Sequence, residues 1–335
     1  MQWPVLPGWR WLASTVLLLA LASLAQGQER AGGSAGGDSA DTRSPEQWLT
    51  MVQQAARRLD YSGTMVYQQG SEVRMSRIVH VFDGKVSHER LQPMDGRPRE
   101  FIRNADEVKC LIPEAKRVVI ERKTRAESFP GLAATATAEL LQHYAVKVAG
   151  RERVGGFDCQ VLEIQPRQGD RYGYRLWVDR ATGLLLRSQT LNDRGDVLEQ
   201  MAFADVRIGG VDREQLRPSW PTEGWKVDEA AHRPVDLKEQ GWRLAPPSGF
   251  KPLFAVRRPM SSGPAALQAV YSDGLASLSV FIEPASASDA SEALPRRGPI
   301  NAYARRVGDA MVTVVGEIPA ETARAVAQAA ERVGR

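Results

Sequence analysis

Residues 171–189, RYGYRLWVDRATGLLLRSQ, constrain the fold most because their apolar and polar side chains alternate with a period of two. In a strand this alternation places Tyr172, Tyr174 and Leu176 on one face and Trp177 on the other. Gly183 follows in a turn-forming Ala-Thr-Gly sequence and is free to take a positive φ. The run therefore predicts an antiparallel hairpin with a wide aromatic and apolar face that another part of the protein, a ligand or a partner must cover.

Short strand-like runs separated by turn signals fill the rest of residues 61–208. Asp-Gly pairs between alternating runs favour hairpins, and the lack of helical patterns between successive runs favours an antiparallel meander. About ten strands and one or two helices are expected here, so the sheet must curl or close to protect its edges. Before it, Ser44 and Pro45 open a helix with one apolar stripe. The predicted fold class is α+β, mainly antiparallel β.

The N-terminal segments and the segment between the two expected domains differ from this pattern in composition. Residues 1–25 have the charge, short apolar run and small residues of a secretory signal peptide, and the apolar run is shorter than the roughly 20 residues of a membrane span. Residues 26–43 are rich in Gly, Ala and Ser and are expected to be a disordered leader. Residues 44–208 form the expected first domain and 209–240 a Pro- and Gly-rich linker. Residues 241–335 read as strands followed by a terminal helix.

Composition and motifs favour binding over catalysis. The formal net charge is +4 without a long Lys/Arg block, which argues against a nucleic-acid partner. The four histidines form no HExxH pattern, and no GxSxG, Walker or GxGxxG sequence occurs. We therefore predict a protein that is not an enzyme and that has no cofactor or metal site.

Apolar and aromatic side chains of the predicted half-open sheet are the candidates for a binding groove. Arg103 is a candidate for contacts with an anionic head group or an acidic partner. For each of these residues, packing in the core or exposure on a strand face is the alternative. The candidates are Met65, Tyr67, Arg103, Tyr172, Tyr174, Leu176 and Trp177.

Cys110 and Cys159 are the two cysteines of the chain. Export would place them in an oxidising compartment, and both fall in predicted strands whose neighbours could bring their Cβ atoms together. A bridge closing about 50 residues would stabilise the fold by roughly 4 kcal/mol in the chain-entropy model. A Cys110–Cys159 disulfide and two free buried thiols are both open.

Several longer runs resemble the MucB/RseB family of periplasmic regulators of the envelope stress sigma factor. In the first domain they are YSGTMVYQ at 61–68, DGRPREFIRN at 95–104 and YRLWVDRATGLLLRS at 174–188. In the second they are GWRLAPPSGF at 241–250, YSDGLASLSVFIEP at 271–284 and VTVVGEIPAET at 312–322. The family resemblance implies a LolA/LolB-like first domain, a half-open barrel wrapped round a helix, and a smaller C-terminal α+β domain.

The family resemblance also implies a function in the periplasm. The protein would bind the periplasmic domain of a membrane-spanning anti-sigma factor and protect it from the site-one protease. Lipopolysaccharide or another lipid would bind the groove and release the partner. The alternative is a periplasmic carrier of lipid or lipoprotein, which would have little use for a second domain. Whether the protein forms a homo-oligomer is left open.

Overall fold

The computed structural model describes residues 41–104, 107–122, 136–229, 233–259, 264–285, 292–293 and 298–333. The expected signal peptide and nearly all of the expected leader lie outside these residues. Within the described residues, no helix is both long enough and apolar enough to cross a membrane.

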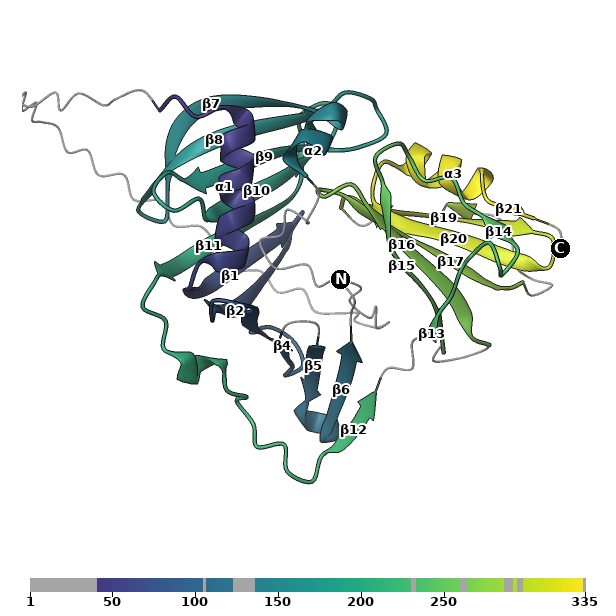
Figure 1. Ribbon diagram of the computed structural model, residues 1–335, viewed down its shortest axis with the longest axis horizontal. Helices are drawn as coiled ribbons and strands as arrows, with labels where there is room; N and C mark the ends of the chain where they lie inside the picture. Colours follow the sequence, from purple (N-terminus) through teal and green to yellow (C-terminus); the bar gives the residue numbers. More distant parts are fainter. Residues whose placement is uncertain are drawn as a thin grey trace, which may run out of the picture. The chain divides into compact units, whose positions relative to one another are not determined.

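The larger part of the described chain is a twelve-stranded sheet with the order β12-β6-β5-β4-β3-β2-β1-β11-β10-β9-β8-β7. Its pairs are antiparallel except β12 with β6, and its two terminal strands, β12 and β7, are not paired with each other. The expected mainly antiparallel, half-open sheet is therefore confirmed (Figure 1). Its elements are α1 Pro45–Arg58, β1 Tyr61–Gln69, β2 Glu72–Phe82, β3 Ser87–Pro93, β4 Glu100–Asn104, β5 Glu107–Ile112, η1 Pro113–Ala115, β6 Arg117–Arg122, α2 Thr137–His143, β7 Tyr144–Val154, β8 Phe157–Pro166, β9 Gly173–Asp179, β10 Leu185–Leu191, β11 Val197–Ile208, η2 Arg213–Leu216 and β12 Lys226–Glu229.

Helix α1 begins as its sequence predicts. The Ser44 hydroxyl accepts a hydrogen bond from Gln47 N at 3.2 Å, and the Gln47 side chain accepts one from Ser44 N at 2.7 Å. This capping box satisfies two backbone donors that have no partner inside the helix. The helix lies across β8, β9 and β10, where Trp48, Leu49 and Val52 are buried against the sheet (Figure 1). The face of the sheet on which α1 packs is called the inner face below.

The opposite, outer face is partly covered by residues 209–229, which lie within the expected linker. Ser219 N donates to Glu100 Oε2 at 2.9 Å, and Trp220 and Trp225 pack against a small core on β4, β5 and β6. Strand β12 then pairs in parallel with β6. Much of the expected linker is thus fixed on the first sheet. Two tryptophans and a strand-forming run supply these contacts, which the Pro and Gly content of the segment does not predict.

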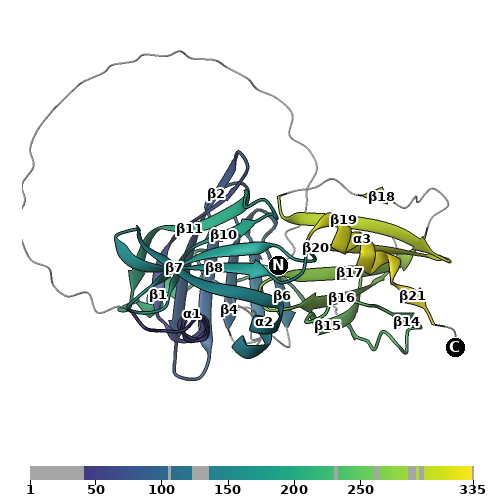
Figure 2. The same cartoon turned by 90° about the horizontal axis from the view of Figure 1, so that it is seen from above.

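The second part of the chain contains a seven-stranded sheet of order β13-β15-β16-β17-β20-β19-β18, with α3 packed on it (Figure 2). The core between α3 and this sheet includes Val312, Val314, Ala323 and Val326. A two-stranded pair, β14 with β21, adds Trp242 to the same core. The elements are β13 Arg233–Pro234, β14 Trp242–Arg243, β15 Lys251–Arg258, β16 Ala266–Ser272, β17 Ser277–Pro284, β18 Glu292–Ala293, β19 Ile300–Val307, β20 Ala310–Glu317, α3 Ala320–Gln328 and β21 Glu331–Arg332.

Candidate partner-binding surface

The strand register brings several of the predicted binding residues onto the inner face. Tyr67 lies opposite Met201, Met201 opposite Ser188, and Ser188 opposite Leu176. Directly opposed residues point to the same face of a sheet, so Tyr67 and Leu176 share the face that carries α1. Met65 and Tyr174 are two residues from them on the same strands and lie on this face as well.

Most of the predicted groove residues on the inner face are core residues. Leu176 and Tyr174 belong to the cluster that α1 covers, and Met65 belongs to a neighbouring core cluster with Phe203. Their exposed fractions are 3% for Leu176, 7% for Tyr174 and 6% for Met65. The inner face is therefore filled by the protein's own helix along β8–β10.

Tyr67 is only half-buried, and its neighbour Gln69 is approached by the second part of the chain, where a Cβ on Gly298 would lie 2.2 Å from Gln69 Nε2. Its hydroxyl donates to Glu199 Oε2 at 2.6 Å and accepts from Gln69 Nε2 at 2.9 Å. Thr190 Oγ1 donates to the other Glu199 oxygen at 3.0 Å. Burial raises the pKa of Glu199 and of the Tyr67 phenol. We call Tyr67, Gln69, Thr190, Glu199 and Met201 the Tyr67 patch.

Glu199 and Met201 were not predicted from the sequence. Both lie on β11, which the sequence indicates as a strand without showing which strand it pairs with. The register with β1 and β10 places these two side chains beside Tyr67. The patch combines an aromatic ring, a thioether and a carboxylate held by two hydroxyl donors, which suits a mixed apolar and polar contact.

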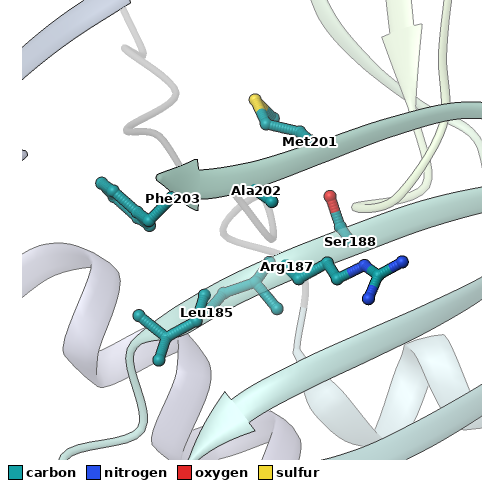
Figure 3. A pocket seen from close by; sticks show the side chains of 7 residues that line it. Leu185, Arg187, Ser188, Met201, Ala202 and Phe203 are labelled. Carbon is teal, nitrogen blue, oxygen red and sulfur yellow. The ribbon is translucent and has the colours of Figure 1, made fainter. Parts of the chain in front are cut away.

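A small pocket near this patch is too small for an acyl chain. Its volume is about 10 Å³, close to the ~10–15 Å³ that one water needs. The pocket is lined by residues of β10 and β11, as Figure 3 shows. A cavity of about 440 Å³ lies elsewhere, lined by residues before β9 and after β14 and by one side of α3. That cavity contains none of the predicted groove residues.

Trp177 and Tyr172 lie apart from the inner-face residues. Trp177 follows Leu176 on β9 and points to the other face, where its Nε1 donates to Glu152 Oε2 at 2.8 Å and the Arg187 guanidinium lies 4.5 Å from its ring centroid. Tyr172 is buried just before β9, and its hydroxyl accepts from Asn301 Nδ2 at 2.8 Å. The predicted residues therefore do not form one continuous groove.

Arg103 belongs to a row of four polar side chains across the inner face. Tyr61 lies opposite His80, His80 opposite Glu89, and Glu89 opposite Arg103. Arg103 Nη1 lies 3.7 Å from Glu89 Oε2, and the Tyr61 and His80 rings stack with centroids 5.0 Å apart. The Arg103 charge is thus shared with a buried carboxylate of the protein itself.

Cys110 and Cys159 are both free thiols in the structure. Cys110 lies on β5 and Cys159 on β8, and seven strands separate these two in the sheet order. Adjacent strands would be needed to bring the Cβ atoms within bonding reach through the ladder. Burial raises the pKa of Cys110, and it raises that of Cys159 to about 12. Neither thiol has the depressed pKa of a reactive cysteine.

Within the described part of the chain, no group of three or more His, Cys, Asp and Glu side chains has a metal-binding arrangement.

Comparison with known proteins matches both parts of the chain to one family. The family model described as MucB/RseB N-terminal domain matches residues 44–220, and MucB/RseB C-terminal domain matches residues 236–331. Sigma factor AlgU regulatory protein MucB of Pseudomonas aeruginosa is 32% identical over 290 residues, which span 84% of this chain and 88% of that protein. Sigma-E factor regulatory protein RseB of Escherichia coli K12 is 27% identical over 288 residues, with coverages of 84% and 88%.

Solved structures give the same match. The complex of Pseudomonas aeruginosa MucA and MucB contains a chain that aligns with a TM-score of 0.71 at 28% identity, covering 87% of this chain and 99% of that one. A crystal structure of MucB alone aligns with a TM-score of 0.63 at 27% identity, with coverages of 86% and 98%.

Proposed function

Because the chain belongs to the MucB/RseB family of sigma factor regulatory proteins, we propose that it binds the periplasmic domain of a membrane-spanning anti-sigma factor. The observation that carries the proposal is the likeness to MucB in its solved complexes, one of which is described as MucB bound to MucA(peri). That likeness extends over both sheets, so the whole described chain supports a partner-binding role in the periplasm.

The regulatory consequence follows from steric protection. A protease must take an extended segment of its substrate into its active site, and a segment held against this protein is not available to it. Binding would therefore protect the anti-sigma factor from the site-one protease and keep the sigma factor sequestered. This role requires binding and no chemical step, which agrees with the regulatory character of the family.

Release requires a ligand that favours the unbound protein. Lipopolysaccharide or another lipid can displace the anti-sigma factor only if it binds the free protein more tightly than the complex. The Tyr67 patch is the part of the inner face that we propose for such competition. It offers half-buried aromatic and thioether groups next to polar groups, whereas Tyr174 and Leu176 are buried in the core cluster that contains α1.

The proposal is tested by titrating the purified chain with the periplasmic segment of its cognate anti-sigma factor. We expect saturable one-to-one binding, loss of binding when lipopolysaccharide is added, and slower cleavage of the segment by the site-one protease in the complex. A scrambled segment of the same composition serves as the control. Absence of binding to the native segment would refute the proposal.

The same preparation separates a regulator from a carrier. Vesicles loaded with labelled lipid are mixed with the protein and unlabelled acceptor vesicles. A regulator gives displacement of the anti-sigma segment without transfer of label, whereas a carrier gives transfer that does not depend on the segment.

A further inference from the structure

The turn between β16 and β17 places one buried carboxylate between the two sheets. Asp273 is 2% exposed. Its Oδ1 accepts from Leu275 N at 3.0 Å and from Ala276 N at 2.8 Å, which are bonds within the turn. Its Oδ2 accepts from Arg171 Nε at 2.7 Å and from Tyr144 Oη at 2.8 Å, and both of these donors belong to the first part of the chain.

The Arg171 guanidinium is as fully enclosed as Asp273. Counting side-chain atoms alone, Arg171 and Asp273 are each 1% exposed. Arg171 Nη1 donates to both oxygens of Asp170 at 2.7 and 2.8 Å, and Nη2 donates to the Ser248 carbonyl. The guanidinium carbon lies 5.0 Å from the centroid of the Phe250 ring. A buried ion pair is tolerated when further hydrogen bonds satisfy both partners, as they do here.

Burial keeps the third member of this cluster in its donor form. Tyr144 is fully buried, and burial, the neighbouring Tyr174 and Asp273 together raise the pKa of its phenol. The hydroxyl therefore stays protonated and continues to donate to Asp273. We call Tyr144, Arg171 and Asp273 the joint.

Several neighbouring contacts also cross between the two parts of the chain. Leu275, at the tip of the turn, packs against the core cluster beneath α1. Thr322 Oγ1, on α3, donates to the Asp170 carbonyl at 3.0 Å. A Cβ on Gly249 would lie 2.3 Å from His143 Nε2, so the His143 imidazole lies directly against the Gly249 backbone.

We propose that the joint couples the two sheets into one cooperative unit of unfolding and fixes their mutual orientation. Contacts between domains are commonly polar and permit relative motion. Here, separating the sheets would leave Arg171 and Asp273 without their mutual partner, and breaking a buried pair is far more costly than breaking an exposed one. It would also uncover Leu275 and the apolar cluster that it contacts.

Asp273→Asn in the full chain tests the coupling without removing the turn. The Asn side-chain oxygen can still accept from Leu275 N and Ala276 N, while the negative charge facing Arg171 is lost. By calorimetry we expect one unfolding transition for the native chain and two for Asp273→Asn. Small-angle scattering is expected to show a broader range of shapes for the variant.

Two further variants make the result specific. Lys251→Gln removes the exposed pair with Glu139, 2.6 Å apart, and should leave a single transition. Val312→Ala weakens the second core alone. Made alone, Val312→Ala should lower the temperature of the single transition. Combined with Asp273→Asn, it should lower the temperature of only one of the two transitions.

A single transition in Asp273→Asn, or two transitions in the native chain, would overturn the proposal. If Asp273→Asn does not fold, Tyr144→Phe provides the test, because it removes one hydrogen bond of the joint and keeps the ring. We expect it to broaden or split the transition, and an unchanged transition would also overturn the proposal.

Discussion

Two histidines on adjacent strands have opposite electrostatic surroundings. His80 is fully buried on β2, with Nδ1 2.8 Å from the Leu59 carbonyl, and burial lowers its pKa from 6.5. His88 on β3 is partly exposed, and hydrogen bonds to Asp83 and Asn104 raise its pKa. The two residues therefore contribute to stability in opposite pH ranges.

The unfolding free energy should show both contributions. The unfolded chain protonates each histidine near pH ~6.5. His80 stays neutral in the fold, so its contribution is full above that pH and decreases as the pH falls toward its folded pKa. His88 gains its partners when charged, so its contribution is full below about pH 6.5 and is lost as the pH rises through its folded pKa.

Urea titrations between about pH 5 and 8, the range of histidine titration, measure how the unfolding free energy changes with pH. They are made on the native chain, on His80→Asn and on His88→Asn. The Asn amide can still donate to Leu59 at position 80. We expect His80→Asn to flatten the acid side of the profile and His88→Asn to flatten the alkaline side. An unchanged acid slope in His80→Asn would contradict the burial argument.

At the Tyr67 patch, Tyr67→Ala should weaken binding of the anti-sigma segment and of lipid. The change removes the half-buried ring and the donor to Glu199, which leaves a partly buried carboxylate with fewer partners. We expect about a tenfold loss of affinity, equivalent to ~1.4 kcal/mol. Met75→Ala on the adjacent strand is the matched control, because Met75 lies opposite Val66 on the outer face. Equal losses in both variants would argue against the patch.

At the scale of the element, β1 and β11 approach too closely for a side chain at Gly63. A Cβ there would lie 2.3 Å from the Asp205 carbonyl oxygen, next to the register shift between Thr64 and Met65. Because the obstacle is backbone, the strands must move apart to accommodate it.

Gly63→Ala should lower the unfolding free energy by about 1–3 kcal/mol, as overpacking does. Chemical denaturation measures the change. Gly150→Ala on β7 makes the same substitution where no atom lies within 4 Å, so it should change stability little. Similar losses at the two positions would show that the close approach at Gly63 is not the cause.

Local patterns predict individual elements of this chain well. The Ser44 cap, a strand within 171–179 and the positive φ of Gly183, which is 81°, all appear in the structure. These features depend on neighbours within a few residues. The register shift in β10 between Leu185 and Arg187 is not visible in the sequence, and it leaves Leu184, Leu185 and Leu186 all buried.

The candidate surface could be predicted only in part for the same reason. Alternation places Tyr174 and Leu176 on one face and Trp177 on the other, as the sequence indicates. It does not show that α1 covers the first two or that Glu199 meets Tyr67. Those facts depend on which distant strands pair, as does the separation of Cys110 from Cys159.

At the scale of the whole molecule, the joint and the proposed function make one combined prediction. If the anti-sigma segment contacts both sheets, a fixed orientation of the sheets reduces the entropy lost on binding. Asp273→Asn should then weaken binding about tenfold, or ~1.4 kcal/mol. Calorimetric titration with the segment measures the loss, and Lys251→Gln is the control. Unchanged affinity in Asp273→Asn would mean that the segment does not depend on the orientation of the sheets.

The route of the chain between the sheets sets the length of the tether that joins them. Residues 209–229 are held on the first sheet, where Gly209 N donates to the Asp60 carbonyl at 2.7 Å and β12 pairs with β6. The next strand, β13, pairs with β15 of the second sheet. Four peptide steps separate Glu229 from Arg233, and an extended chain spans at most about 14 Å over four steps. While β12 and β13 keep their partner strands, this short connection limits how far the two sheets can separate. Loss of the joint would then let the sheets rotate relative to each other without moving far apart.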